Sequence, residues 1–364
     1  MSETSLGMAT RLALALALGA CGGGASPATD ATPADVAEDR AIAPREDSAV
    51  MLDDRSEPAL DATATTDAPS ATTDAGSTGT PVVIDARAIP AAAALYTVDR
   101  RMWSIRDVGR AIESVLSGAS RPDNVILYVH GRACGGGEPE KSLTGAMPEL
   151  ARDYSSAPIM LFWPGSDDSC PLGFPEARAR ESGPALAVVV GDLYNYRLAN
   201  PARVAGVRFT LVTHSMGSIV LEAATAVRGF ETVPPSAFET VVINASASAA
   251  SGHNAWLARV GLSRHRYVTV NNGDNVLTAA GIGRATRLGK SITSVPLAAG
   301  VDYTDFDANN VNHAYYLVSG QSGAGMRAFY ERVMNGMEFD FVGAPGVGSS
   351  SARDGAGVHV FNGR

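Results

Sequence analysis

Three polar residues in the second half of the chain have the types and the order needed for nucleophilic acyl chemistry. Ser215 follows the apolar run "RFTLVTH", Asp274 ends "NNGD" after another such run, and His313 lies in "NNVNHAYY". A serine hydroxyl needs a histidine to take its proton, and that histidine needs an acid that fixes its tautomer. The sequence therefore predicts Ser215 as nucleophile, His313 as base and Asp274 as orienting acid, in one of the chain orders known for such triads.

The acid has more than one candidate. Asp274 lies in a turn at the end of a predicted strand, where an orienting acid is expected, but it also precedes the helix-like "NVLTAAG" and could be an ordinary helix cap. The competitors are Asp302, Asp305 and Asp307, which lie on the segment that leads into the histidine. We therefore prefer Asp274.

Chain order selects the base. His253 and His265 precede the acid, and His359 lies in the C-terminal tail, so His313 is preferred. A loop histidine with a purely structural role is the alternative reading of His313. We expect His214, the neighbour of the serine, to be packed and to point away from the turn.

The turn around the serine fits a nucleophile elbow in most respects. Such an elbow holds the serine hydroxyl at the junction of a strand and a helix, in the pattern G-x-S-x-G. Gly217 supplies the second glycine, but Thr213 stands in place of the first. A β-branched residue should crowd the turn without excluding it, so the pattern alone is a weak indication.

An oxyanion hole needs two backbone N–H groups aimed at the charge that develops on the carbonyl oxygen. The N–H of Met216, at the start of the predicted helix, is one candidate. The N–H of Arg132, which follows "YVHG", is the other. We expect His130 in that segment to order the loop rather than to react.

Alternating strands and helices surround these residues. Short apolar runs predict buried parallel strands at 124–131, 158–165, 208–215, 239–246 and 266–274. Helical patterns accompany them at 104–117, 176–198, 216–228, 252–260 and 323–337. The alternation predicts an α/β fold with a mostly parallel central sheet, helices on both faces and a site at the carboxyl ends of the strands.

Several segments together resemble a known family. "YVHG", "LFWPG" with a downstream "FPEARARESGPAL", "VTHSMGS", "VNNGD" and "NHAYY" are similar to motifs of a bacterial family of α/β hydrolases of unknown function, grouped with esterases and lipases. The likeness runs over roughly residues 81–337. It implies the α/β-hydrolase fold and the triad Ser215, Asp274 and His313, and it supplies no substrate.

Two cysteines fit the same picture. Cys134 comes shortly after the "YVHG" strand and Cys170 shortly after the "LFWPG" strand. These strands are neighbours in the fold that the resemblance implies, and an even pair of cysteines in an exported protein favours a disulfide. We predict a Cys134–Cys170 bond that ties the oxyanion loop to the loop over the site. Two free thiols are the alternative.

The N-terminus has the pattern of an export signal. An arginine, the apolar run "LALALAL" and small residues form a segment too short to span a bilayer. The ending "LGAC" resembles the lipobox of bacterial lipoproteins, which implies a signal peptide at 1–20 and lipidation of Cys21. We therefore expect an exported protein anchored to a membrane by lipid, in the periplasm or at the outer membrane or cell surface. An ordinary signal peptide or a buried helix is the alternative.

The net charge lies in a tether that follows the signal. Residues 21–80 are rich in Ala, Ser, Thr, Asp and Pro and predict disorder. From residue 22 to 80 there are 12 acidic and 3 basic residues, and the difference equals the formal net charge of −9 for the whole chain. The predicted hydrolase domain at 81–342 therefore has no basic excess for nucleic acid. Residues 343–364 are Gly- and Ser-rich and predict a flexible tail.

The predicted function is a serine hydrolase that cleaves an ester or related acyl bond of a small-molecule substrate. His and Cys residues do not cluster at metal-ligand spacing, and no glycine-rich turn has the dinucleotide-binding pattern, so we expect no metal and no cofactor. Acyl transfer to an alcohol would use the same triad. The alternative outside enzymes is a surface lipoprotein that keeps the fold and binds a ligand or a partner. The oligomeric state stays open.

Overall fold

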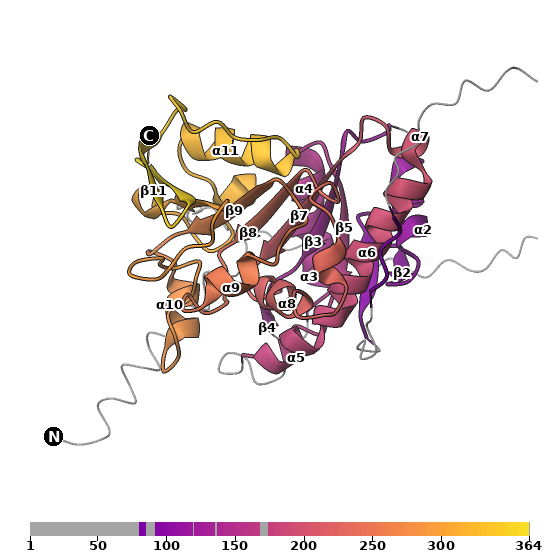
Figure 1. Ribbon diagram of the computed structural model, residues 1–364, viewed down its shortest axis with the longest axis horizontal. Helices are drawn as coiled ribbons and strands as arrows, with labels where there is room; N and C mark the ends of the chain where they lie inside the picture. Colours follow the sequence, from indigo (N-terminus) through magenta and orange to yellow (C-terminus); the bar gives the residue numbers. More distant parts are fainter. Residues whose placement is uncertain (1–79, 85–91, 119, 135–136, 168–173, 364) are drawn as a thin grey trace, which may run out of the picture. The chain divides into compact units, whose positions relative to one another are not determined.

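A mostly parallel sheet of ten strands forms the centre of the fold (Figure 1). The computed structural model describes residues 80–84, 92–118, 120–134, 137–167 and 174–363. The predicted signal peptide, Cys21, the tether up to residue 79 and Cys170 lie outside the described residues, so the predictions made for them stay predictions.

The strand order places the site-bearing strands in the middle of the sheet. From one edge to the other the strands are β11 (Val347–Arg353), β12 (Ala356–Phe361), β10 (Asp302–Asp305), β9 (His265–Val270), β8 (Thr240–Asn244), β7 (Arg208–His214), β3 (Asn124–Val129), β5 (Ala157–Phe162), β1 (Ala94–Thr97) and β2 (Met102–Ser104). Neighbours from β12 to β5 run parallel. Only the pairings of β11 with β12 and of β1 with β5 and β2 are antiparallel in this sheet.

Helices cover both faces of the sheet (Figure 1). They are α2 (Val108–Leu116), α3 (Glu140–Thr144), α4 (Ala146–Asp153), α5 (Glu176–Glu181), α6 (Gly183–Ala199), α7 (Pro201–Val204), α8 (Gly217–Ala224), α9 (His253–Leu257), α10 (Asn275–Gly281) and α11 (Ala324–Met334). Helix α6 packs between α2 and α8, whereas α11 packs on β7 and β8. The predicted fold class, a mostly parallel sheet with helices on both faces, is confirmed.

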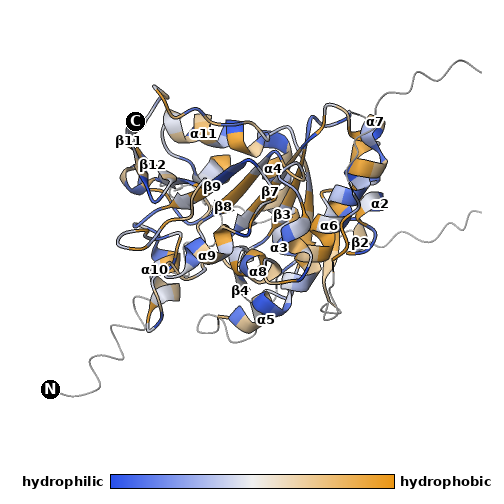
Figure 2. Ribbon diagram, viewed as in Figure 1, coloured by the Kyte–Doolittle hydropathy of each residue, from blue (hydrophilic) through white to orange (hydrophobic). Residues whose placement is uncertain are grey.

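The apolar runs of the sequence become the interior of the sheet (Figure 2). Every residue of β3 and β8 is buried, because helices cover both of their faces. A Val, Leu or Ile side chain gains about 1.5–3 kcal/mol when it is fully buried. This burial fixes the register of β7 between β3 and β8, and therefore the point at which Ser215 leaves the strand.

The expectation of a flexible tail at 343–364 is wrong. Strands β11 and β12 form a hairpin, and β12 joins the main sheet parallel to β10. Asp354 and Gly355 make the turn with φ of 56° and 77°, the left-handed conformation that an Asp-Gly hairpin turn requires. The high Gly and Ser content hid the strand pattern, whereas the Asp-Gly pair was the signal that could have revealed it.

Within the described ranges, no helix combines the length and the apolar character needed to cross a membrane.

Candidate active site

Ser215 lies in a strained turn between β7 and α8. Its φ is 52°, in the left-handed region that residues other than glycine rarely adopt. The turn is held on both sides: the Ser215 N–H donates to the Asn244 carbonyl at 3.0 Å, and the Ser215 carbonyl accepts from the Ala247 N–H at 3.1 Å. A strained strand-to-helix turn of this kind presents a serine hydroxyl at the carboxyl edge of a sheet.

Two glycines allow the chain to approach this turn closely. A Cβ at Gly217 would lie 2.4 Å from the carbonyl oxygen of Val129, so only glycine permits α8 to start against the end of β3. A Cβ at Gly131 would lie 3.0 Å from the Cβ of Ser215. The loop after β3 therefore passes directly beside the serine.

Thr213, the departure from the G-x-S-x-G pattern, is accommodated inside β7. It pairs in register with Val129 on one side and Ile243 on the other, and its side chain is fully buried. Its hydroxyl has no hydrogen-bond partner among the described residues. An unpaired buried hydroxyl costs about 1–3 kcal/mol. The threonine therefore costs stability without preventing the turn, which comes two residues later.

Asp274 both caps a helix and binds His313, the two roles that the sequence left open. One carboxylate oxygen accepts from the Leu277 N–H at 2.9 Å and caps α10, and the other accepts from Nδ1 of His313 at 2.7 Å. Burial opposes ionisation of this carboxyl, but His313 and the N–H groups of Leu277 and Val276 outweigh it and lower the pKa of Asp274. The acid is therefore ionised near neutral pH and fixes the orientation of His313.

The segment "HAYY" anchors the histidine to the sheet through its two tyrosines. The hydroxyl of Tyr315 lies 3.1 Å from Oγ1 of Thr269 on β9. The hydroxyl of Tyr316 lies 2.7 Å from that of Tyr128 on β3. All of these side chains are buried, so the loop that bears His313 is fixed to two strands of the sheet.

The structure brings Asp274 and His313 into direct contact and places Ser215 at the same edge of the sheet. With Nδ1 bound to Asp274, Nε2 is the nitrogen of His313 that can receive a proton. No hydrogen bond joins His313 to the Ser215 hydroxyl among the residues that the structure describes, and such bonds are often loose before substrate binds. The catalytic roles of the three residues stay predictions.

His214 is the residue that sequence reasoning missed. Its ring centroid lies 4.7 Å from that of His313, so the side chain belongs to the site instead of pointing away from it. Its position depends on the reversal of the backbone at Ser215, which the alternation of a regular strand does not predict. The sequence feature that points to a site role for His214 is its position as the last residue of β7, at the carboxyl edge of the sheet.

His130 orders the loop after β3, as expected. Its Nε2 accepts from the Trp163 N–H at 3.2 Å, and its own carbonyl accepts from the indole N–H of Trp163 at 2.9 Å. Because Nε2 accepts, Nδ1 carries the proton and donates to the Gly131 carbonyl at 2.7 Å. Burial lowers the pKa of His130, which keeps the ring neutral.

The loop after β3 also pairs with the loop after β5. The short strands β4 (Ala133–Cys134) and β6 (Ser166–Asp167) run parallel to each other. This pairing places the backbone of Cys134 beside the segment that leads to Cys170, but the disulfide itself stays a prediction. The assignment of the oxyanion hole to the N–H groups of Arg132 and Met216 stays a prediction as well.

Charged side chains fix the far end of this second loop. The guanidinium groups of Arg132 and Arg284 lie 4.6 and 4.8 Å from the ring centre of Phe174. Glu176 forms ion pairs with Arg284 at 3.0 Å and with the buried Arg287 at 2.8 Å. The chain beyond the loop is therefore tied both to the loop after β3 and to the segment after α10.

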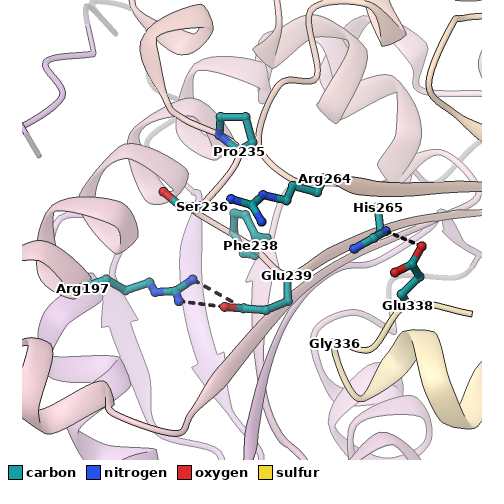
Figure 3. Close-up of a pocket in the computed structure, with 9 residues that line it drawn as sticks. All are labelled: Arg197, Pro235, Ser236, Phe238, Glu239, Arg264, His265, Gly336 and Glu338. Atoms are coloured by element: carbon teal, nitrogen blue, oxygen red, sulfur yellow. Dashed lines mark hydrogen bonds and ion pairs between the residues drawn. The ribbon is translucent and has the colours of Figure 1, made fainter. Parts of the chain in front are cut away.

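A cavity of about 310 Å³ lies at the opposite end of the sheet, near the amino ends of β8 and β9 (Figure 3). Charged residues dominate its lining: Arg197 pairs with Glu239 at 2.8 Å, and Nδ1 of His265 lies 3.7 Å from a carboxylate oxygen of Glu338. None of the three triad residues lines this cavity. The elbow and the triad, not this cavity, therefore define the candidate active site.

No group of three or more His, Cys, Asp or Glu side chains suited to a metal ion occurs in the described part of the chain. Asp274 and His313, the two predicted partners of Ser215, bond each other.

Comparisons with known proteins give only distant likenesses. No protein-family model matches the chain, and the search of curated proteins finds no match. Among solved structures the chain is similar to a carboxyl esterase from the fungus Tuber melanosporum, with 14% identity over 57% of this chain and 75% of that one and a TM-score of 0.33. It is also similar to a thermophilic carboxylesterase from a metagenomic library, with 12% identity over 61% of this chain and 83% of that one and a TM-score of 0.34. A hormone-sensitive lipase from a metagenome library has 14% identity over 61% and 79%, with a TM-score of 0.33.

These likenesses concern the fold and not the chemistry of the site. The sheet is mostly parallel, and a strained serine turn lies at its carboxyl edge. Ser215, Asp274 and His313 follow one another in the chain order Ser, Asp, His that is found with a serine turn of this kind. The protein has the α/β-hydrolase fold.

Proposed function

We propose that the protein is a serine hydrolase that cleaves a carboxylic ester or a related acyl bond. The observation that carries the proposal is the 2.7 Å hydrogen bond between the buried Asp274 and Nδ1 of His313, at the edge of the sheet where Ser215 occupies its strained turn. An ionised acid that orients a histidine, close to a serine at the start of a helix, is an arrangement suited to acyl transfer.

In the first half of the reaction, the Ser215 hydroxyl attacks the carbonyl carbon of the substrate. His313 Nε2 takes the hydroxyl proton as the Oγ–C bond forms, and Asp274 stabilises the resulting imidazolium. The carbonyl oxygen becomes an oxyanion that the N–H groups of Met216 and Arg132 are proposed to bind, and each such donor contributes about 3–4 kcal/mol. The imidazolium then gives its proton to the leaving alcohol as the C–O bond breaks.

In the second half, water releases the acyl group. His313, neutral again, takes a proton from a water molecule whose oxygen attacks the acyl carbon. Collapse of the second oxyanion breaks the Oγ–C bond, and the proton returns to Ser215. The product is a carboxylic acid, and the enzyme is regenerated without any redox change.

Covalent labelling with a fluorophosphonate probe tests this proposal. We expect the folded protein to be labelled, and labelling to be lost in both Ser215→Ala and His313→Ala. If a well-folded protein is not labelled, the hydrolase proposal fails and the alternative remains, a non-catalytic surface protein that binds a ligand or a partner.

Acceptor chemistry separates hydrolysis from acyl transfer. We propose hydrolysis, so short acyl esters should turn over in buffer without an added alcohol. Release of one equivalent of leaving group followed by a stop, with turnover restored by an added alcohol, would instead identify an acyltransferase that uses the same residues.

We also propose that the protein is exported and anchored through lipid on Cys21. The support is the sequence pattern "LALALALGAC" at the N-terminus. Fractionation of cells that express the full chain should place it with membranes, and Cys21→Ser should release it. Retention of Cys21→Ser in the membrane fraction would contradict the anchor.

A further inference from the structure

Four aromatic rings form a continuous column that ends on the proposed base. Tyr128 stacks on Tyr316 with 5.9 Å between ring centroids, Tyr316 lies 4.7 Å from His214, and His214 lies 4.7 Å from His313. The column starts on β3, where the hydroxyl of Tyr128 bonds that of Tyr316. The ring of His214 therefore packs between the ring of Tyr316, which Tyr128 holds in place, and the ring of His313.

The orientation of the His214 ring is fixed by Asn244. The side-chain oxygen of Asn244 accepts from the hydroxyls of Tyr330 at 2.5 Å and of Thr269 at 3.1 Å, so its amide group faces the other way. That amide lies 3.4 Å from Nδ1 of His214. The NH2 group of an amide can only donate, so Nδ1 of His214 accepts and carries no proton.

The surroundings keep His214 uncharged. Burial is the first cause that lowers the pKa of His214 well below its usual range, and electrostatic interaction with the neighbouring imidazoles of His313 and His130 lowers it further. A neutral ring against His313 matters because a second cation at this distance would oppose the imidazolium that forms there during the reaction. The lowered pKa keeps the ring neutral, and the hydrogen bond from Asn244 places its proton on Nε2.

We propose that His214 is a positioning residue for His313: its neutral ring packs on the base, fixes the plane of that ring and keeps Nε2 directed toward Ser215. The inference rests on the proposed function, since it assigns a second histidine to the same site. Asp274 holds His313 at one atom and leaves rotation about that bond open. The ring of His214 supplies a second point of restraint, so that two contacts define the plane of His313.

The test compares substitutions that keep or remove the ring in the full chain. His214→Phe keeps a planar ring, whereas His214→Ala removes it. Misplacement of a reacting group by about 1 Å can cost on the order of 100-fold in rate, and we expect His214→Ala to lose at least tenfold in kcat with little change in KM. His214→Phe should lose less than about threefold, because its ring still packs on His313.

A spectroscopic readout makes the test independent of catalysis. The proton between Nδ1 of His313 and Asp274 should give a deshielded proton resonance that is sharp when the ring is held. We expect that resonance in the wild type and in His214→Phe, and its broadening by solvent exchange in His214→Ala. His253→Ala serves as the matched control, because it removes a buried histidine whose hydrogen bonds go to Tyr303 and the Ala250 carbonyl and not to the triad residues.

The outcomes separate this inference from the proposed function. If the wild type hydrolyses esters and His214→Ala keeps both kcat and the sharp resonance, the positioning role is wrong and the hydrolase proposal stands. If the wild type is neither labelled nor active, the hydrolase proposal fails, and the resonance alone decides whether His214 restrains His313. Equal loss of kcat in His214→Phe and His214→Ala would also overturn the role assigned to the ring.

Discussion

Two Ser–His–Asp sets occur in the described part of the chain, in different backbone settings. The first is Ser215 with His313 and Asp274, at the carboxyl edge of the sheet. In the second, the Ser350 hydroxyl lies 2.9 Å from Nδ1 of His359, whose Nε2 lies 3.2 Å from Asp302. By side-chain contacts alone the second set looks more like a triad, because Ser350 is within hydrogen-bond distance of His359, whereas no hydrogen bond joins Ser215 to His313 among the described residues.

The backbone around each serine separates the two sets. Ser350 lies within the extended, exposed edge strand β11, whereas Ser215 occupies a left-handed turn at the start of α8. The side chain of Asp302 is 37% exposed and that of Asp274 is fully buried. No helix begins beside Ser350 to supply N–H groups to an oxyanion, since β11 continues to Arg353.

Side chains of the right types do not by themselves make a nucleophile. A reactive serine also needs a strained turn that exposes it, N–H groups beside it and a buried acid. The second set instead joins three strands, since its members lie on β10, β11 and β12. We interpret it as a structural latch of the C-terminal hairpin.

The largest expected effect separates the two serines directly. Ser215→Ala should lower kcat for ester hydrolysis by about 10⁴-fold or more, because no other hydroxyl replaces the nucleophile. Ser350→Ala should leave kcat unchanged. Steady-state assays on short acyl esters measure both, and a large loss of kcat in Ser350→Ala would contradict the claim that Ser350 has no catalytic role.

The acids should differ almost as much. Asp274→Asn should reduce kcat by about 10³- to 10⁴-fold, because the amide no longer stabilises the tautomer and the cation of His313. Its effect on stability should be small, since asparagine caps a helix as well as aspartate does. Asp302→Asn should change kcat by less than a factor of about two, as expected for a residue outside the site. A similar loss of kcat in both variants would contradict the distinction between site and latch.

Two glycines distinguish a rigid turn from an adaptable strand. In Gly217→Ala the added Cβ would lie 2.4 Å from the backbone oxygen of Val129, and we expect a loss of about 3 kcal/mol in the free energy of unfolding. In Gly357→Ala it would meet side-chain atoms of Asp302 and His359, which can move, so about 1 kcal/mol is expected. Urea unfolding measures both values, and the reverse order would show that the elbow tolerates a side chain.

Lower pH should destabilise the protein through histidines that fold in neutral form. Burial is the first cause that lowers the pKa of His130, His214 and His253. Below about pH 6.5 the unfolded chain binds protons that the folded chain does not, so the free energy of unfolding falls with pH by up to about 1.4 kcal/mol per unit for each histidine. The pKa of Asp274 is lowered, so its contribution is lost only at more acidic pH.

Urea unfolding between pH 7.5 and 5.5 measures this dependence. His253→Phe should make the slope shallower without affecting the site. A flat profile in the wild type would show that these histidines stay accessible to protons in the folded state.

Long apolar runs made the middle of the sheet predictable. Strands β3, β7, β8 and β9 were predicted because each is buried on both faces, which demands a continuous hydrophobic sequence. Strand β10 has the sequence "DYTD" and β11 the sequence "VGSSSAR", and neither carries such a run. Strand β10 pairs with β9 and β12, and β11 pairs with β12. These pairings depend on where the C-terminal hairpin packs in the fold, which local sequence does not encode.

The site was predictable to the extent that it follows the ends of those strands. Ser215, Asp274 and His313 were named from chain order and strand ends, and the structure places the last two in contact. The double role of Asp274 is not predictable from the sequence, because an aspartate between a strand and a helix fits a cap and a triad acid equally well, and only the position of His313 in space shows that its two oxygens serve both. Position at the end of a strand points to His214 as a residue near the site, but the direction of its ring is not predictable from the sequence, because Tyr316 and His313 pack against it from distant segments.

The most direct test of the central claim is to map the site of fluorophosphonate attachment on the folded full chain by peptide mass spectrometry. The chain contains both serines, so one experiment compares them under identical conditions. We predict one adduct per molecule, on Ser215, with Ser350 unmodified. An adduct on Ser350, or no adduct on Ser215 when the folded protein has been treated with the probe, would contradict the assignment of Ser215 as the nucleophile.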